Sequence, residues 1–416
     1  MLDTIKDLYK FNRTLVGDDF DKSLEYIKGI LPGMNILEFP TGMEYGTWKV
    51  PQKWTVRDAW IKYKDKKILD FKKEPLSVIV GSIPIHGTVD KKELMHYVYN
   101  SPMTPDSVPY VFKYYEKDWG FSMPTSQFAK LKDGEYEVFI DSEYTDGTLK
   151  IGEYIIPGGK KEILITAHLD HPFQANDNLS GVAVAIELAK KLKTKYTVRI
   201  LFVPETIGTM AYVYTQDLSN VEFGITLDMV GNKNTIMMQE TFAQTEKINK
   251  AGVMAMSLIA KETYRKGPFR APLGAEDYIF NDPLIGIPTI FFTRHPYDEY
   301  HTNKDTVDII DEKMLKETVK IVKKTIQVYE KDWTPVRSFK GPLMRSRFKA
   351  QQPDKETNRK FDYFFYLMDG ERTLLDLAYS CQLDFDKMNK LLKQLLKDGF
   401  VSKNIQKPGV QGRSKK

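Results

Sequence analysis

The sequence predicts an α/β protein built around a mostly parallel β-sheet that helices cover on both faces. Nearly continuous apolar runs have the length and composition of buried strands, at residues 162–167, 197–203, 223–227 and 289–292. Segments with apolar residues at helical spacing alternate with them, at residues 180–192, 247–264 and 312–329. Strand–helix alternation of this kind is typical of a three-layer α/β sandwich.

The remaining segments of this α/β region are predicted from shorter patterns. Residues 136–140 and 151–156 are expected to form a pair of strands. Residues 1–31 are expected to be helical, because apolar residues recur at three- and four-residue spacing up to Pro32-Gly33.

Three domains are expected. Residues 1–35 and 126–332 form the α/β domain. Residues 36–125 form an inserted β-rich domain, since short apolar or aromatic runs there are separated by Pro and Gly. Four of the five tryptophans lie in this insert, which we interpret as a small core rather than a ligand platform.

The third domain, residues 333–416, is predicted to resemble a winged helix with a basic tail. Three short helical segments are expected, at residues 361–368, 373–379 and 385–396. Lysines on the last segment, and basic residues up to Lys416, would allow contact with DNA. Basic residues on a helix are usually a solvated face, so we favour a protein partner over DNA.

Composition narrows the class of protein. The 416 residues are 42% apolar and 28% charged with a net charge of +5, which is typical of a soluble globular protein. The single cysteine, Cys381, excludes an internal disulfide framework and a thiolate-rich zinc finger. Since no signal-like hydrophobic region and no run of eighteen apolar residues occurs, we expect a cytoplasmic protein without a membrane segment.

Ligand-type side chains follow the predicted strands or stand in loops beside them: His168, Asp170, Asp177, Glu205, Asp228 and His301. The carboxyl ends of parallel strands meet at one edge of a sheet, so these side chains should converge there. Imidazole nitrogens and carboxylate oxygens are zinc ligands. The pattern therefore predicts a site for one or two Zn²⁺ ions.

The motifs around these residues resemble those of the co-catalytic di-zinc aminopeptidases over roughly residues 133–332. They are Ala167–Asp170, Ala175–Gly181, Thr226–Gly231 and Tyr300–Thr306, in the family's order. The resemblance implies that His168, Asp177, Asp228 and His301 ligate zinc, with Asp177 bridging two ions. It also implies a phosphorylase/hydrolase-like fold.

The whole chain is similar to a bacterial aminopeptidase-like group that has an inserted small β domain and a C-terminal winged helix. Phe39–Gly42, Trp54–Ala59 and Asp118–Phe121 carry this resemblance in the insert.

One departure concerns the family's pair of adjacent glutamates, a general base followed by a ligand. This chain has Pro204-Glu205-Thr206 there. Counting back from Gly208 makes Glu205 the base and puts Thr206 at a ligand position, and we favour this alignment. Aligning on the strand end makes Glu205 the ligand. Asp170 is expected to hold an imidazole in its ligating tautomer.

Neighbouring residues are weaker candidates: His171, His295, Glu276, Asp277, Arg270 and Arg294. Both histidines precede a proline and are expected to be loop residues. The two acids would contact a substrate amine or cap a short helix. The arginines are expected to be surface charges.

The leading functional hypothesis is a zinc-dependent hydrolase that cleaves an amide bond, most simply an aminopeptidase acting on short peptides or small amides. The inserted domain should then wall the strand-end rim and limit substrate size. Two alternatives stay open: a non-catalytic regulator with a peptidase fold, and an amidase or deacylase of a sugar or small metabolite. The oligomeric state is not predicted.

Overall fold

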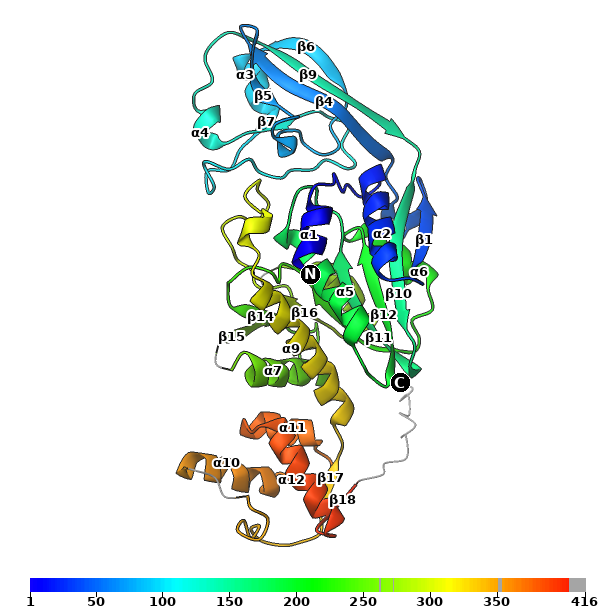
Figure 1. The fold of residues 1–416 in the computed structure, drawn as a ribbon, viewed down its shortest axis with the longest axis vertical. Coiled ribbons are helices and arrows are strands. Elements are labelled where there is room, and N and C mark those ends of the chain that lie inside the picture. Colours follow the sequence, from blue (N-terminus) through cyan, green and yellow to red (C-terminus); the bar gives the residue numbers. More distant parts are fainter. Residues whose placement is uncertain (262, 272, 351–353, 404–416) are drawn as a thin grey trace, which may run out of the picture. The chain divides into compact units, whose positions relative to one another are not determined.

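The computed structural model describes residues 1–261, 263–271, 273–350 and 354–403 (Figure 1). The chain forms two compact units. The larger unit contains Met1–Thr245 and Thr263–Lys320, and the smaller contains Glu246–Glu262 and Ile321–Lys416. Among the described helices, none is both long and apolar enough to cross a membrane.

The larger unit is built on an eight-stranded sheet. Its strands, in spatial order, are β1 (Asn35–Pro40), β10 (Thr148–Ile156), β12 (Tyr196–Val203), β11 (Gly159–His168), β13 (Val221–Leu227), β16 (Thr289–Thr293), β14 (Ile236–Gln239) and β15 (Tyr264–Gly267). The central strands β12, β11, β13 and β16 are parallel to one another. Strand β10 pairs antiparallel with β1 and β12, and β14 pairs antiparallel with β16 but parallel with β15. The prediction of a mostly parallel sheet is confirmed.

Helices of the larger unit pack on this sheet: α5 (Gly181–Lys191), α6 (Ile207–Thr215) and α8 (Glu276–Phe280). Helices α6 and α8 share a core cluster with Leu164, Leu201 and Val203, which belong to the central strands. Helix α9 (Glu312–Lys331) begins in the larger unit and ends in the smaller one. The α/β sandwich therefore leaves the carboxyl ends of four parallel strands at one rim.

A second sheet of the larger unit has four antiparallel strands. In spatial order they are β5 (Lys66–Asp70), β4 (Lys53–Tyr63), β9 (Glu135–Thr145) and β6 (Ile85–Asp90). Here one expectation is wrong: residues 136–140 and 151–156 are strands, but they lie in different sheets. The reason is that β9 buries Tyr136, Val138 and Ile140 in a separate core.

That separate core includes Trp54 and Trp119, which agrees with the interpretation of the aromatic residues as a small core. Smaller elements complete this region: the 3-10 turn Pro75–Ser77, α3 (Lys91–His96), β7 (Val98–Tyr99), β8 (Phe121–Ser122) and α4 (Thr125–Phe128). The hairpin of β2 (Glu44–Tyr45) and β3 (Trp48–Lys49) instead packs against α6 and the core of the main sheet. Strand β1 pairs with the main sheet, whereas β9 belongs to the second one.

The N-terminal helical segment is interrupted. Helix α1 (Leu2–Tyr9) and helix α2 (Asp18–Ile30) are separated by residues 10–17, where a continuous helix was expected. Arg13 stands in this interruption with a fully buried side chain. Its guanidinium donates to the carbonyl of Leu8 (2.6 Å) and to carbonyls about 160 residues away. This tertiary contact explains the break.

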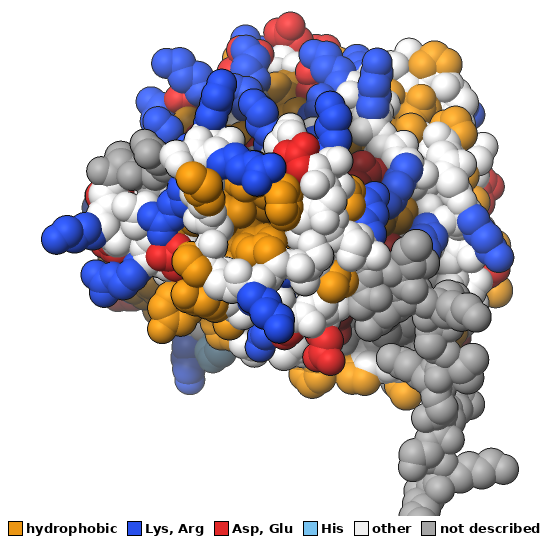
Figure 2. All heavy atoms as spheres, turned by 90° about the horizontal axis from the view of Figure 1, so that it is seen from below, with side chains coloured by type: hydrophobic (Ala, Val, Ile, Leu, Met, Phe, Trp, Pro, Cys, Tyr) orange, Lys and Arg blue, Asp and Glu red, His pale blue; other side chains and the backbone are white. Residues whose placement is uncertain are grey.

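The smaller unit contains α7 (Lys247–Ile259), α10 (Lys355–Tyr366), α11 (Leu374–Cys381) and α12 (Phe385–Lys397), and β17 (Pro335–Arg337) pairs antiparallel with β18 (Val401–Lys403). The three C-terminal helices are confirmed, while the winged-helix interpretation stays a prediction. Lys387, Lys390 and Lys393 on α12 are exposed. Figure 2 shows a face on which Lys and Arg side chains surround a hydrophobic patch. The predicted basic tail beyond Lys403 lies outside the described residues.

Candidate metal centre

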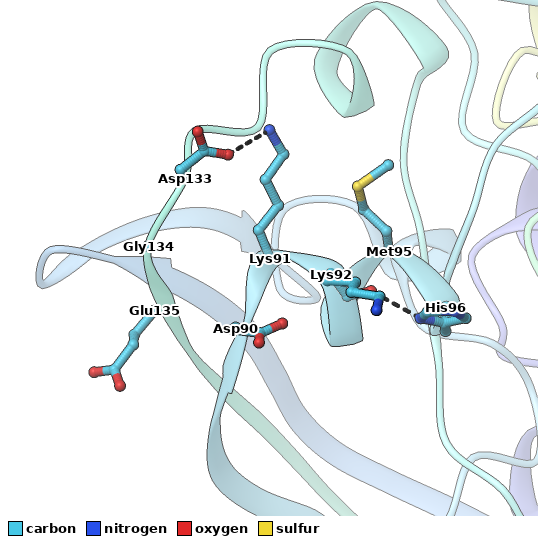
Figure 3. A pocket seen from close by; sticks show the side chains of 8 residues that line it. All are labelled: Asp90, Lys91, Lys92, Met95, His96, Asp133, Gly134 and Glu135. Carbon is cyan, nitrogen blue, oxygen red and sulfur yellow. Dashed lines mark hydrogen bonds and ion pairs between the residues drawn. The ribbon is translucent and has the colours of Figure 1, made fainter.

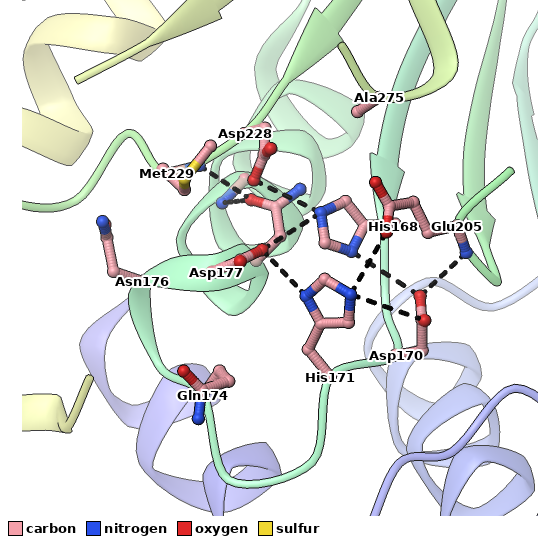
Figure 4. Close-up of polar contacts among 12 residues, drawn as sticks. His168, Asp170, His171, Gln174, Asn176, Asp177, Glu205, Asp228, Met229 and Ala275 are labelled. Carbon is pink, nitrogen blue, oxygen red and sulfur yellow. Dashed lines mark hydrogen bonds and ion pairs between the residues drawn. The ribbon is translucent and has the colours of Figure 1, made fainter. Parts of the chain in front are cut away.

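Four of the predicted ligands converge at the strand-end rim. His168 ends β11, Asp228 follows β13, and Asp177 lies in the turn before α5. The His168 Nε2 atom is 3.2 Å from Asp177 Oδ1 and 3.3 Å from Asp228 Oδ1 (Figure 4). On the other side of Asp177, its Oδ2 is 3.0 Å from Nε2 of His301. Asp177 therefore lies between the two histidines.

Asp170 and Glu205 complete this group. The Asp170 Oδ1 atom accepts a hydrogen bond from the backbone N–H of Glu205 (2.8 Å) and lies 3.6 Å from His168 Nδ1. Asp170 is buried, but the Glu205 side chain is 28% exposed. The carboxylate of Glu205 can therefore meet both the cluster and solvent.

His171 also belongs to the cluster, contrary to the expectation of a plain loop residue. Its buried ring lies with Nδ1 3.1 Å from Asp177 Oδ1 and Nε2 3.2 Å from Glu205 Oε2. Ligand atoms of His168, His171 and Asp177 lie within 4.8 Å of one another. One feature of the sequence could have indicated His171: the chain has only six histidines, and His171 lies three residues after the predicted ligand His168.

Arg13 explains why the His171 loop turns inward. Its guanidinium donates to the backbone carbonyls of Leu169 (2.8 Å), His171 (2.7 Å) and Gln174 (3.0 Å). Burial lowers the pKa of Arg13 to about 10, although Asp170 opposes the shift. A buried cation therefore holds the segment that carries His171 to the cluster. No local sequence pattern indicated this role.

The turn that presents Asp177 is fixed from one side by the strand-end segment after β13. Asn178 donates to the Leu227 carbonyl (2.7 Å) and accepts from the Met229 N–H (3.2 Å). Asn176 accepts from the Gly231 N–H (2.8 Å), and Ser180 accepts from the Val230 N–H (2.9 Å). The polar residues around Asp177 are thus used to dock its loop against the segment that carries Asp228.

Asp305 fixes the same turn from the other side. Its carboxylate accepts from the backbone N–H groups of Ala175, Asn176 and Asp177 at 3.2, 2.6 and 3.1 Å, and from the Tyr297 hydroxyl at 2.7 Å. Burial raises the pKa of Asp305 to about 7. Sequence reasoning quoted Asp305 only within the His301 motif and assigned it no role.

The cluster is electrostatically coupled. Burial lowers the pKa of His168, but the Asp228, Asp170 and Asp177 carboxylates more than offset this and hold it well above the ordinary value. Burial works against ionisation of Asp177, yet the imidazoles of His171, His168 and His301 bring its pKa well below the usual range. Burial and the charge of Asp177 raise the pKa of Asp228 to about 6.

The donor set fits zinc. Within the described residues, several buried atoms of the cluster have no hydrogen-bond partner: His168 Nδ1, His171 Nδ1, Asp177 Oδ1 and His301 Nε2. Two ligand atoms of a tetrahedral ion, each at about 2.1 Å, are roughly 3.4 Å apart. The nitrogen–oxygen separations of 3.0–3.2 Å at Asp177 are close to that spacing.

The weaker candidates differ in whether they are exposed or buried. Arg270 is exposed, as expected, and its guanidinium lies 5.0 Å from the Tyr278 ring. Arg294 is not a surface charge: it is buried, donates to backbone carbonyls and pairs with Glu317 at 2.7 Å. Burial lowers the pKa of His295, which lines the cleft described next. Glu276 and Asp277 are both buried.

A cleft of about 1390 Å³ opens beside His301. Its lining includes Ser101–Ser107 in part, Tyr110 from the β-rich region, and residues 295–302 from the loop after β16. The Tyr110 N–H donates to the His301 carbonyl (2.8 Å), and the two ring centroids are 5.3 Å apart. Tyr110, which sequence reasoning missed, thus packs against a predicted ligand.

A second hollow has a different character. It lies over α3 and the start of β9, where Lys91 pairs with Asp133 at 3.0 Å (Figure 3). The residues that line it, all within the described part of the chain, include none of the predicted site residues. The metal centre and its cleft are therefore the candidate site.

Comparison with solved structures defines the class of fold. A Clostridium acetobutylicum protein provisionally named a peptidase superimposes with a TM-score of 0.82 and 30% identity, covering 97% of this chain and 95% of that one. The Bacillus subtilis zinc aminopeptidase BSAP superimposes with a TM-score of 0.59 and 16% identity, covering 78% and 93%. The fold is that of the zinc aminopeptidases.

Sequence comparison identifies the family. The family described as Domain of unknown function (DUF4910) matches residues 2–332, and the chain belongs to it. A Clostridium acetobutylicum protein is 32% identical over 400 residues, covering 92% of each chain. Its name gives it an aminopeptidase-like domain and, provisionally, a role in polysaccharide biosynthesis. Aminopeptidase YwaD of Bacillus subtilis is 27% identical over 219 residues, covering 46% of this chain and 45% of its own.

Proposed function

We propose that the protein is a zinc-dependent hydrolase of the aminopeptidase type, cleaving the amide bond next to a free amino terminus in short peptides or small amides. The observation that carries the proposal is the convergence of His168, Asp177, Asp228 and His301 at one strand-end rim, where Asp177 Oδ1 and His301 Nε2 are buried without a hydrogen-bond partner in the described part of the chain. These residues would hold one or two Zn²⁺ ions.

A bound zinc ion would supply a Lewis acid for the scissile carbonyl and for the attacking water. Glu205 is assigned the role of general base, because its carboxylate borders the cluster and reaches solvent. It would take the proton of the attacking water and deliver it to the leaving amine. Asp170 positions both partners, since it holds the Glu205 backbone and lies beside the His168 ring.

The cleft beside His301 supports a limit on substrate size. Residues 101–110 contribute one side of it, so a substrate that reaches the cluster must fit between this segment and residues 295–302. Short or extended substrates satisfy that requirement better than the surface of a folded protein.

The proposal is tested by metal content and by hydrolysis. Protein purified without added metal should carry more than about half an equivalent of zinc, and His301→Ala should carry less. Amino-acid p-nitroanilides should be hydrolysed, while the same compounds with an acetylated amino group should not. Protein that contains no zinc and binds none when it is added would refute the proposal.

A second candidate is an amidase or deacylase acting on an amino sugar. It is favoured by one observation, the provisional role in polysaccharide biosynthesis in the name of the Clostridium acetobutylicum relative. Release of acetate from N-acetylated amino sugars, without hydrolysis of the anilides, would select this candidate. Zinc binding without either reaction would favour a regulator with a peptidase fold.

A further inference from the structure

Glu276 is an unusual residue for the interior of a protein. It begins α8, its side chain is fully buried, and neither of its carboxylate oxygens has a hydrogen-bond partner in the described part of the chain. Its neighbour Asp277 is equally buried but bonded, to the Gln239 side-chain amide (2.8 Å) and the Ala275 N–H (2.9 Å). The isolation of Glu276 therefore is not a general property of this segment.

The charges that act on Glu276 come from the metal centre. Burial raises the pKa of Glu276 to about 8; His168 opposes the shift, whereas Glu205 and Asp228 add to it. Helix α8 packs against β11 and β13, the strands that end at His168 and Asp228. Figure 4 shows Ala275, the preceding residue, on the rim that carries Asp228 and Glu205.

An ionised carboxylate in such a place needs a counter-charge, because burial without partners is costly and the nearby acids repel it. Within the described residues, Glu276 forms no ion pair with a lysine or an arginine. A divalent cation at the cluster is a counter-charge that the donor set already accommodates.

The position of Glu276 also matches a gap in the site. The sequence offers only one carboxylate, Glu205, where the motif resemblance described above implies two adjacent ones. The segment that contains Glu276 adjoins this loop, since the Tyr278 hydroxyl lies 3.3 Å from Thr206 Oγ1. A carboxylate from a different element thus stands beside the loop that lacks one.

We propose that Glu276 supplies the second carboxylate of the metal centre, in place of the acidic residue that is missing next to Glu205, and strengthens zinc binding there. This inference rests on the proposed function in one respect, that the cluster binds zinc at all. It assigns a role that neither the motif resemblance nor the comparisons give to this position.

The test is a zinc titration of the full-length protein after chelator treatment, with affinity and stoichiometry measured against a chromophoric competitor. Glu276→Gln keeps the shape of the side chain and removes its charge. We expect it to weaken binding of at least one zinc equivalent about 10- to 100-fold. Glu276→Asp keeps the charge on a shorter side chain, so its affinity should lie between the two.

Asp277→Asn is the matched control, because it changes the adjacent buried acid, which is already bonded. Its zinc affinity should stay within about twofold of the native value, while its urea midpoint falls. Circular dichroism establishes that each variant is folded before titration.

The outcomes separate the inference from the proposed function. If the native protein binds no zinc, both fail. If the native protein and Glu276→Gln bind zinc equally well, only the inference is overturned. Equal zinc affinity with a raised KM for substrates with a free amine would assign Glu276 to the substrate ammonium group. If Glu276→Gln does not fold, Glu276→Asp decides: zinc affinity measurably below that of the native protein and of Asp277→Asn supports the inference, and affinity equal to that of Asp277→Asn overturns it.

Discussion

The two halves of the metal centre are built differently. The buried half consists of His168 and Asp228, which are almost completely buried and stand at the ends of neighbouring central strands. The open half consists of His301 and Glu205, whose side chains are 27% and 28% exposed and stand on loops. Asp177 touches both sides.

The difference lies in what fixes each half. His168 and Asp228 are held by the strands that they follow or end, and the Asp177 turn is docked beside them. Asn178 donates to the Leu227 carbonyl, whereas Asn176 and Asp305 accept from backbone N–H groups. His301 is held at its backbone by the Tyr110 N–H, which comes from the β-rich region. A buried pair beside a solvent-accessible pair would suit the proposed zinc site, which has to keep its metal and still admit substrate.

The largest effect is expected from Asp177→Asn, because Asp177 is shared by both halves. The amide cannot serve as an anionic bridging ligand, so zinc affinity should fall by more than about 100-fold and hydrolysis should reach background. Elemental analysis after dialysis measures the loss. Asp298→Asn, an exposed acid that lines the cleft, is the control and should keep its zinc. Full zinc content in Asp177→Asn would show that the halves do not share this residue.

Glu205→Gln tests the open half alone. If Glu205 is the general base, hydrolysis should fall by about 10²- to 10⁴-fold while most of the zinc stays bound. Activity and metal content are measured on the same preparation. Loss of zinc in this variant would instead support the alignment in which Glu205 is a ligand, and the open half would then bind metal as well as act on substrate.

The buried half was largely predictable from the sequence. His168 and Asp228 stand at the ends of apolar runs that predict strands. Because the carboxyl ends of parallel strands meet at one edge of a sheet, these two residues could be expected to lie close together. The strand runs themselves are long and apolar, so the central sheet was predictable as well. The sheets that β9 and β1 join were not predictable, because alternation identifies a strand but not the sheet it joins.

The open half depends on contacts that local patterns do not contain. His171 precedes a proline and is indeed in a loop, but the loop is drawn inward by Arg13, more than 150 residues earlier in the chain. Tyr110 reaches His301 from a region with its own core. Such contacts are set by tertiary packing, so short sequence windows could not indicate them.

Arg13→Met should lower stability while testing what holds the His171 loop. Removal of the guanidinium leaves several buried carbonyls without donors, and we expect a loss of about 3 kcal/mol in the free energy of unfolding. Urea denaturation measures it. Arg13→Lys keeps the charge but reaches fewer carbonyls, so its stability should be intermediate. A Met variant as stable as the native protein would mean that the loop is held in another way.

The stability of the zinc-free protein should depend on pH, because several buried groups in and beside the cluster have shifted pKa values. Burial and Asp177 raise the pKa of Asp228 to about 6, and burial raises that of Asp305 to about 7. A carboxyl with a raised pKa stabilises the fold at low pH, and this contribution is lost as pH rises from about 4 through those values. His168, whose pKa is held well above its ordinary value, loses its contribution in the same direction.

The urea midpoint of chelator-treated protein should therefore be lower at pH 8 than at pH 6. Added zinc should reduce this difference, because the metal replaces protons as the counter-charge. A midpoint that rises with pH in the zinc-free protein would contradict the assignment.

The smallest effect is expected from Tyr110→Ala, which leaves every predicted ligand in place. Since the backbone bond to His301 survives and only ring packing is lost, we expect KM to change by about three- to tenfold with zinc content unchanged. Tyr115→Ala, on an exposed ring outside the lining of the cleft, is the control. If Tyr110→Ala lost zinc, the ring would matter for metal binding rather than for the shape of the cleft.

The two supports of the loop that carries His171 and Asp177 lie far apart in the chain: Arg13 is near its start, and Asp305 stands close to residue 320, where the larger unit ends. A ribosome adding about 5–20 residues per second needs roughly 15–60 s to pass from one to the other. In the later part of that time the nascent chain carries His168, His171 and Asp177 but still lacks Asp305, the acid that orders their loop. The loop that carries His171 and Asp177 can therefore reach its final form only late in synthesis, once residue 305 has been made.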